Sequence, residues 1–398
     1  MSYRRTTSTV CLVAVVVALV AACSSSGSSG AGSDDPGSTT AAPAITTPLE
    51  RAKTYGERGP YSVGYTETKL GDGRQVVVWY PSTAQAVKGH DREQIDVASL
   101  LSPELQAKIP AEDRVKYPAD AFLDAEPRPE KGGYPVVVFS HGFAGFPEQS
   151  VTLTTHLASW GYVVAAPNHV ERSLDGLLGT AAENVTKSTD PEVLSATLDL
   201  VEAQSAKSGS LLHGTVDDDK AAVAGHSAGA GAAYRVAGID PRFKTWISYS
   251  VGLGNDGTDT APPKVPDKPG MVMLGTGDGI IPPAASEAVY AGMQSPKYLV
   301  SVTGAGHLVF SDLCLIGADK GGIVNIAKTL ELPIPDELLK LGSDGCGDGY
   351  PPTDEAFPAI DSASVSFLRW VFQTDAAPDA LTTEALAPLG TPVSVEHD

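Results

Sequence analysis

The chain contains a serine, an acid and a base in an order that could perform acyl transfer. Ser227 lies at the centre of Gly-His-Ser-Ala-Gly, residues 225–229, directly after the apolar run 221–224. A Gly-x-Ser-x-Gly motif between a strand and a helix is typical of a nucleophile elbow, the tight turn that holds a serine in a strained backbone conformation. The glycines are needed there because a side chain would collide with the neighbouring strand or helix. We therefore expect Ser227 to be a nucleophile.

A serine hydroxyl needs a base within about 3 Å to take its proton as it attacks. Of the eight histidines, His307 follows an expected strand in Thr-Gly-Ala-Gly-His, where small residues leave room for the imidazole to reach the serine. His169 also follows a strand and is the rival base, whereas His226 lies inside the elbow and points away from the serine. The histidines without catalytic neighbours in the sequence are His90, His156, His213 and His397.

An acid is needed to hold the imidazole in the correct tautomer and to stabilise its cationic form. Asp278 lies at the exit of an expected strand, within residues 274–283. The resulting order along the chain, serine, then aspartate, then histidine, is the order found with nucleophile elbows. Asp256 and Asp259, which follow the preceding strand, are the rival acids.

Backbone amides must stabilise the negative charge that develops on the substrate oxygen, and the usual sources are the residue after the nucleophile and an early loop. Ala228 supplies the first amide. We place the second at Phe143, because it lies in residues 140–145 directly after a strand that ends at Phe139. His141, in the same loop, is expected to brace it rather than to act as a base.

The elements that position these residues alternate between buried strands and helices. The patterns predict strands over 74–81, 136–139, 162–166, 221–224, 245–251, 271–274 and 298–303, and helices over 151–160, 190–205 and 361–372. Strand, helix and strand at this spacing indicate a parallel sheet with right-handed crossovers. The fold class is therefore α/β, with a mostly parallel central sheet and helices on both faces. Residues 82–133, charged and rich in proline, are expected to form a surface excursion.

The N-terminal residues are typical of a secretory signal. Arg4 and Arg5 precede an apolar run over 10–22 that is too short to span a bilayer comfortably. Leu-Val-Ala-Ala-Cys, ending at Cys23, resembles a bacterial lipobox, in which the cysteine becomes the lipidated first residue; an ordinary cleaved signal is the alternative. We expect a signal peptide over 1–22, a disordered tether over 23–50, a catalytic domain over 51–375 and a flexible tail over 376–398.

The formal charge of −20 makes nucleic acid an improbable partner and would repel anionic lipid. Attachment to a membrane is therefore expected through a lipid on Cys23 rather than through a basic face. The acidic residues Asp217, Asp218 and Asp219 are interpreted as a polar turn before the elbow strand rather than as a metal site.

Two cysteines remain once Cys11 in the signal and Cys23 are set aside. Cys314 and Cys346 are expected to form a disulfide in an oxidising compartment, and two free thiols are the alternative. They lie within an insertion over 312–355 that contains aliphatic residues between polar ones. The insertion either borders the acyl pocket or covers the core; its aliphatic residues are Ile323, Val324, Ile326, Leu330, Leu338 and Leu339.

These motifs together resemble the α/β-hydrolase superfamily of serine hydrolases, and most closely the bacterial proteins similar to dienelactone hydrolase and to platelet-activating-factor acetylhydrolase. The resemblance covers residues 74 to about 312, in the stretches 78–81, 134–142, 157–166, 225–229 and 304–312. It implies catalysis by a serine, an aspartate and a histidine, with no metal and no organic cofactor.

Two departures narrow the expected substrate. Dienelactone hydrolases use a cysteine nucleophile, which is absent here, and the acetylhydrolase branch places its acid after the strand that follows the elbow helix. Asp278, one strand later, resembles bacterial polyester hydrolases and cutinase-like enzymes, although their aromatic clamp is not recognisable. We therefore expect an exported carboxylic ester hydrolase acting on small-molecule or lipid esters through an acyl-enzyme. The alternatives are a polyester, cutinase-like or lipase-type hydrolase, an acyltransferase, and a surface lipoprotein without catalysis.

Overall fold

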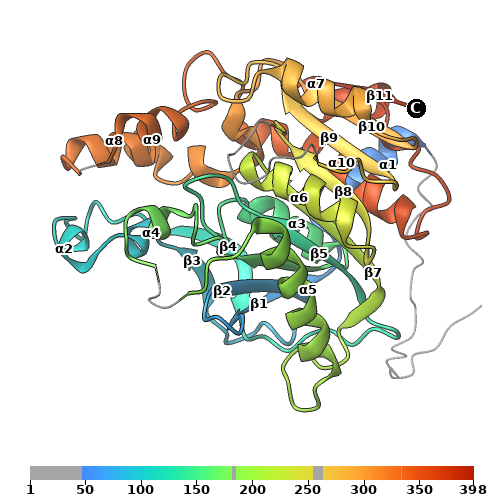
Figure 1. The fold of residues 1–398 in the computed structure, drawn as a ribbon, viewed down its shortest axis with the longest axis horizontal. Helices are drawn as coiled ribbons and strands as arrows, with labels where there is room; N and C mark the ends of the chain where they lie inside the picture. Colours follow the sequence, from blue (N-terminus) through green and yellow to red (C-terminus); the bar gives the residue numbers. More distant parts are fainter. Residues whose placement is uncertain (1–46, 182–184, 254–262, 333) are drawn as a thin grey trace, which may run out of the picture. The chain divides into compact units, whose positions relative to one another are not determined.

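The computed structural model describes residues 47–181, 185–253, 263–332 and 334–398 (Figure 1). These residues build an 11-stranded sheet in the order β11-β10-β9-β8-β7-β5-β6-β2-β1-β4-β3. The strands from β6 to β10 in this order run parallel, and the remaining pairs are antiparallel except β1 with β4. The strands are β1 Ser62–Lys69, β2 Gln75–Ser82, β3 Arg92–Ile95, β4 Tyr117–Leu123, β5 Tyr134–Ser140, β6 Val163–Pro167, β7 Val216–His226, β8 Phe243–Tyr249, β9 Gly270–Gly275, β10 Lys297–Val302 and β11 Val393–His397.

Both faces of this sheet are covered by helices, as expected for a parallel sheet built from apolar strands. Alternate residues of β2 enter different cores: Val77 and Trp79 pack with α1, α3 and α10, whereas Val76 and Val78 pack with α5, α6 and α7. The helices are α1 Pro48–Gly56, α2 Pro103–Gln106, α3 Val151–Ser159, α4 Leu174–Leu177, α5 Asp190–Ala206, α6 Ala228–Ile239, α7 Pro283–Gly292, α8 Gly322–Thr329, α9 Asp336–Leu341, α10 Thr353–Val371 and α11 Thr383–Leu386. Short 3-10 turns are η1 Val97–Leu100, η2 His307–Phe310, η3 Asp312–Cys314, η4 Ala318–Lys320 and η5 Ala387–Leu389.

Several segments are more ordered than the sequence predicted. The expected surface excursion over 82–133 contributes β3 and β4, which extend the sheet beyond β1. The expected flexible tail over 376–398 contains β11, which pairs antiparallel with β10 and buries Val393. In both cases the strand pairs with a strand that is distant in sequence. A local sequence pattern therefore cannot predict the pairing.

Element boundaries also differ. Residues 48–50, which were expected to belong to the tether, form the first turn of α1, which Thr47 caps in a reciprocal capping box with Glu50. The last large helix begins at Thr353 rather than at Asp361, and it passes through Pro358. Asp217–Asp219, predicted as a turn, lie within β7.

The predicted signal peptide over 1–22, Cys23 and the tether as far as residue 46 lie outside the described residues. Among the residues that are described, none of the helices has both the length and the apolar character needed to cross a membrane.

Candidate active site

Ser227 occupies the sharp turn between β7 and α6, with φ 58° and ψ −121°. This left-handed conformation is unfavourable for a residue with a side chain, so the surrounding packing must hold it. A Cβ on Gly225 would lie 2.2 Å from the Gly229 carbonyl oxygen, and one on Gly229 would lie 2.0 Å from the Ser140 carbonyl oxygen. Both flanking glycines are therefore required by close backbone approach, as the motif predicted.

The structure brings Ser227, His307 and Asp278 into one hydrogen-bonded chain. His307 Nε2 lies 2.8 Å from Ser227 Oγ, and His307 Nδ1 lies 2.8 Å from Asp278 Oδ2. The network assigns the tautomer: Nδ1–H donates to the carboxylate, and Nε2 accepts from the serine hydroxyl. His307 is fully buried, whereas 8% of Ser227 and 7% of Asp278 is exposed, so the base is shielded from solvent between two slightly exposed partners.

Asp278 follows β9 and is held as an anion. Its Oδ1 accepts hydrogen bonds from the amides of Ile280, at 2.9 Å, and Ile281, at 2.7 Å. Burial raises the pKa of this carboxyl, but the hydrogen bond and charge of His307 and the two amides together lower it below its ordinary value. The rival acids Asp256 and Asp259 lie outside the described residues.

His226, the residue before the serine, braces the base from the opposite side. Its Nε2–H donates to the His307 carbonyl oxygen at 2.9 Å, and its Nδ1 accepts from Gln149 Nε2 at 2.9 Å. Burial, helped by the neighbouring His307, lowers the pKa of His226 to about 3, so the ring stays neutral. His226 therefore points away from the serine, as expected, and fixes the backbone that carries the base.

The two amides expected to form an oxyanion hole lie beside the serine. Ala228 is the first residue of α6, and the first amides of a helix have no partner within the helix. Phe143 lies in the loop after β5, is 46% exposed and lines the same cavity as Ser227. A Cβ on Gly142, the preceding residue, would lie 3.4 Å from Ser227 Cβ, so the loop passes close to the serine.

The direction of the Phe143 amide is set by Arg172, which sequence reasoning missed. Arg172 Nη1 donates to the Gly142 carbonyl oxygen at 2.9 Å and also to the His141 carbonyl oxygen. His141 Nδ1–H donates to the same Gly142 oxygen at 2.8 Å. Because the C=O of Gly142 and the N–H of Phe143 belong to one planar trans peptide and point in opposite directions, fixing the oxygen fixes the amide.

A buried polar network holds Arg172 in place. Its Nε donates to Asp190 Oδ2 at 2.9 Å, and its Nη2 donates to Ser140 Oγ at 2.9 Å. His169, the rival base, belongs to this network: Nδ1 lies 2.8 Å from Asp190 Oδ1 and Nε2 lies 2.9 Å from Ser140 Oγ. Both ring nitrogens of His169 thus face partners within this network, and the serine hydroxyl donates its hydrogen bond to His307 Nε2.

Asp344, at the end of the 312–355 insertion, also contacts the site and was not predicted. Its Oδ1 accepts from the His307 amide at 2.6 Å and from the Gly279 amide at 3.3 Å, and its carbonyl accepts from the Leu308 amide at 2.9 Å. Nothing in the local sequence separates Asp344 from the nearby Asp348, because the distinction depends on how the insertion folds back. The expected disulfide between Cys314 and Cys346 is present beside it.

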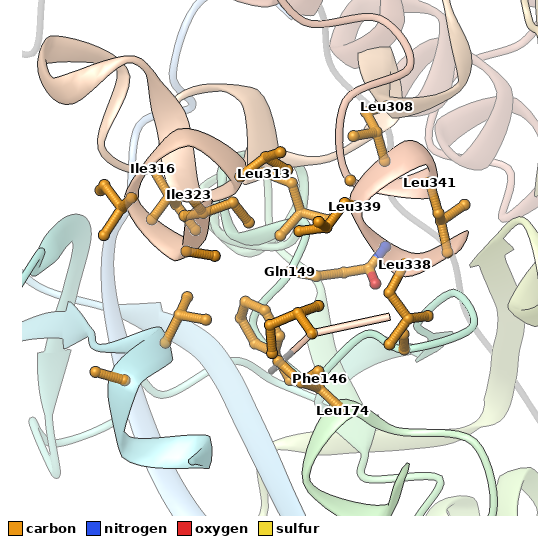
Figure 2. Close-up of a pocket in the computed structure, with 18 of the residues that line it drawn as sticks. Phe146, Gln149, Leu174, Leu308, Leu313, Ile316, Ile323, Leu338, Leu339 and Leu341 are labelled. Atoms are coloured by element: carbon orange, nitrogen blue, oxygen red, sulfur yellow. The ribbon is translucent and has the colours of Figure 1, made fainter. Parts of the chain in front are cut away.

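A cavity of about 170 Å³ opens from the serine and is mostly apolar (Figure 2). Ser227, His307 and Phe143 are among the residues that line it. The insertion forms much of the remaining wall, and it also packs against the core through Leu313, Ile316 and Ile323, so the segment both borders the cavity and covers the core. Its lining side chains are Leu313, Ile316, Ile323, Val324, Ile326, Leu338, Leu339 and Leu341.

Comparisons with known proteins agree with this architecture. Residues 102–270 match the family model of chlorophyllase. A solved structure, a ferulic acid esterase from Streptomyces cinnamoneus, superimposes with a TM-score of 0.51 and 22% sequence identity, covering 78% of this chain and 90% of that chain. No curated protein sequence matches the chain. The structural match confirms the predicted α/β-hydrolase fold.

Proposed function

We propose that this chain, an α/β-hydrolase, is a serine carboxylic ester hydrolase that works through an acyl-enzyme. The observation that carries the proposal is the unbroken hydrogen-bonded chain from Asp278 through His307 to Ser227, which lines an apolar cavity. The family-model and structural matches to esterases support the same reaction class. Fold alone does not assign a reaction, so the proposal rests on the site.

In the first half-reaction Ser227 Oγ attacks the ester carbonyl carbon while His307 Nε2 takes the hydroxyl proton. The negative charge that forms on the carbonyl oxygen is stabilised by the amides of Ala228 and Phe143. The intermediate collapses as the bond to the alcohol oxygen breaks, and His307 gives its proton to that oxygen. The alcohol leaves, and the acyl group remains on Ser227.

In the second half-reaction a water molecule enters where the alcohol stood. His307 takes a proton from this water as the water oxygen attacks the acyl carbon, and the same two amides stabilise the second intermediate. Collapse breaks the bond to Ser227 Oγ, which regains the proton from His307, and a carboxylic acid is released. Asp278 stays ionised throughout and stabilises the imidazolium that forms in each half-reaction.

We further propose that the enzyme acts outside the cytoplasm, attached to a membrane. The lipobox-like sequence before Cys23 supports a lipid tether, and the Cys314–Cys346 disulfide is of the kind that persists in oxidising compartments. Cys23→Ala should move the full-length protein from the detergent phase to the aqueous phase on phase partitioning. Retention in the detergent phase would exclude lipidation at Cys23 as the anchor.

Labelling with a fluorophosphonate probe tests the nucleophile directly. The wild type should be labelled at one serine, identified as Ser227 by peptide mass spectrometry, and Ser227→Ala should remain unlabelled. Ser343→Ala, an exposed serine in the insertion, is the matched control and should label like the wild type. Labelling that persists in Ser227→Ala would overturn the proposal. Product analysis with and without an added alcohol separates hydrolysis from acyl transfer.

A further inference from the structure

The cavity beyond the serine is walled by aliphatic side chains from segments far apart in sequence. Figure 2 shows Leu313, Ile323 and Leu339 on one side and Phe146 and Leu174 on the other, all reaching into the same space. The segment before β4, which the sequence predicted to be a surface excursion, contributes more aliphatic side chains to the wall of the cavity. Its lining residues are Val97, Ala98, Leu101, Ile109 and Val115.

The polar side chains along this wall are already hydrogen-bonded or ion-paired within the protein. Arg114 Nε donates to Asp96 at 2.7 Å, and Asp113 lies 3.6 Å from Lys320 Nζ. Gln149 is bonded to the Gly142 amide and to the ring of His226. A phenolic hydroxyl entering the cavity would meet mostly aliphatic surface, and burying it there without a partner is unfavourable.

The two helices of the insertion, α8 and α9, present aliphatic side chains to the cavity, and Ile323 of α8 also packs against the core. No residue of α8 or α9 is fully buried, although both helices carry large aliphatic residues. Those residues are half-buried because they line the open space: Ile323, Val324, Ile326, Leu338, Leu339 and Leu341. A bound hydrocarbon chain would remove this apolar surface from water, which is the condition for favourable hydrophobic binding.

From these observations we propose that the site takes esters with a flexible aliphatic chain of medium length in preference to esters of planar aromatic acids. The inference rests on the proposed esterase function and narrows it. An apolar cavity of about 150 Å³ holds one benzene molecule, so the volume fixes the number of carbons, and the preference for a chain over a phenolic acid rests on the aliphatic wall. The cavity here, about 170 Å³, therefore corresponds to a chain of about six to eight carbons.

The test uses p-nitrophenyl esters with acyl chains of two to sixteen carbons, with p-nitrophenyl ferulate as the aromatic comparison that has the same leaving group. We expect kcat/KM to rise about fourfold for each methylene buried, up to about eight carbons, and to gain nothing beyond that length. A second series, acetate esters of straight-chain alcohols, shows whether the acyl or the alcohol side occupies the cavity. A flat profile in both series, or a preference for p-nitrophenyl ferulate over the eight-carbon p-nitrophenyl ester, would overturn the inference.

Variants of α9 test whether this cavity sets the preference. Leu338→Trp fills it and should lower kcat/KM for the eight-carbon ester by about tenfold or more relative to the two-carbon ester, since pocket fit discriminates in this range. Lys340→Trp, on the exposed side of the same helix, should keep the wild-type profile. Leu338→Ala enlarges the cavity, so the acyl chain length beyond which kcat/KM stops rising should increase.

Fluorophosphonate labelling of each variant separates the two proposals. A variant that is labelled at Ser227 but has an unchanged chain-length profile contradicts the substrate inference and leaves the esterase proposal standing. Absence of labelling in the wild type contradicts the esterase proposal itself. If Leu338→Trp fails to fold, Leu338→Ala still tests the inference. An unchanged chain-length limit in Leu338→Ala would be evidence that the aliphatic chain does not bind in this cavity.

Discussion

Asp344 accepts a 2.6 Å hydrogen bond from the backbone amide of His307, so the disulfide-bridged insertion directly contacts the loop that carries the base. The same carboxylate oxygen accepts from the amide of Gly279, the residue after Asp278. One oxygen thus joins the loop after β9, which holds the acid, to the turn after β10, which holds the base. The insertion that walls the cavity therefore also positions two members of the proposed triad.

Asp344→Ala should lower kcat by about 10- to 100-fold with little change in KM, because small displacements of a catalytic group are costly in the transition state. Asp344→Asn should retain most of the activity, since its amide oxygen can still accept both hydrogen bonds. The measurement is kcat and KM of the two variants by steady-state kinetics. Asp348→Ala, a change in an exposed aspartate of the same segment, is the control. Equal losses in Asp344→Asn and Asp344→Ala would show that the charge, rather than the positioning, matters.

Ser227→Ala and His307→Ala should each lower kcat by about 10⁴-fold or more, and the double variant should lose little beyond either one. The reason is that proton transfer and nucleophilic attack are one event, which fails when either partner is missing. Esterase assays of the three variants at saturating substrate provide the measurement. Additive losses in the double variant would mean that the two residues act independently.

Asp278→Asn should keep the fold and lower kcat by about 10³- to 10⁴-fold. The asparagine amide would donate to His307 Nδ1, which places the proton on Nε2 and removes the acceptor that Ser227 needs. Kinetics together with the thermal unfolding temperature check this. A mild effect would indicate that the acid comes from another loop.

The residues at strand ends were predictable, because buried strands and their exits are local patterns in the sequence. Ser227, Asp278 and His307 all lie in such exits, and parallel strands bring their carboxyl ends to one edge of the sheet. The glycines of the elbow were predictable for the same reason, since their requirement is set by the turn.

The supporting residues were not predictable from local patterns. Arg172 acts on the Gly142 carbonyl from the loop after β6, and Asp344 acts on His307 from the far end of an insertion. Each contact depends on how distant segments fold back, and neither residue type stands out among the chain's many charged residues. The same reason explains β3, β4 and β11, whose short sequences become strands only beside their partners.

Arg172→Lys should lower kcat by about 10- to 100-fold while KM stays near its wild-type value, because an oxyanion donor acts mainly in the transition state. A single ammonium cannot reach the Gly142 carbonyl, Ser140 Oγ and Asp190 together as the guanidinium does. Arg242→Lys, a change in a more exposed ion-paired arginine, is the control and should keep wild-type kinetics. A raised KM with unchanged kcat would argue for a role in substrate binding instead.

Glu93 should make the protein less stable as pH rises from about 5 to 8. This residue of β3 is 4% exposed, and it accepts a 2.9 Å hydrogen bond from Trp79 Nε1. Burial raises its pKa to about 8, against an unfolded value of 4.5. Between these two values the folded state keeps the proton and the unfolded state releases it. Stability therefore falls by about 1.4 kcal/mol per pH unit from this group.

Glu93→Gln removes this titration while its amide oxygen can still accept from Trp79. The free energy of unfolding, from urea titrations at pH 5, 6.5 and 8, should therefore fall less in Glu93→Gln than in the wild type, by up to about 4 kcal/mol over the range. Other titrating groups, including the buried histidines, are common to both proteins and cancel in the difference. Glu287→Gln, a change in an exposed glutamate on α7, should follow the wild type. Parallel pH profiles for the wild type and Glu93→Gln would show that Glu93 is already ionised in the folded protein at neutral pH.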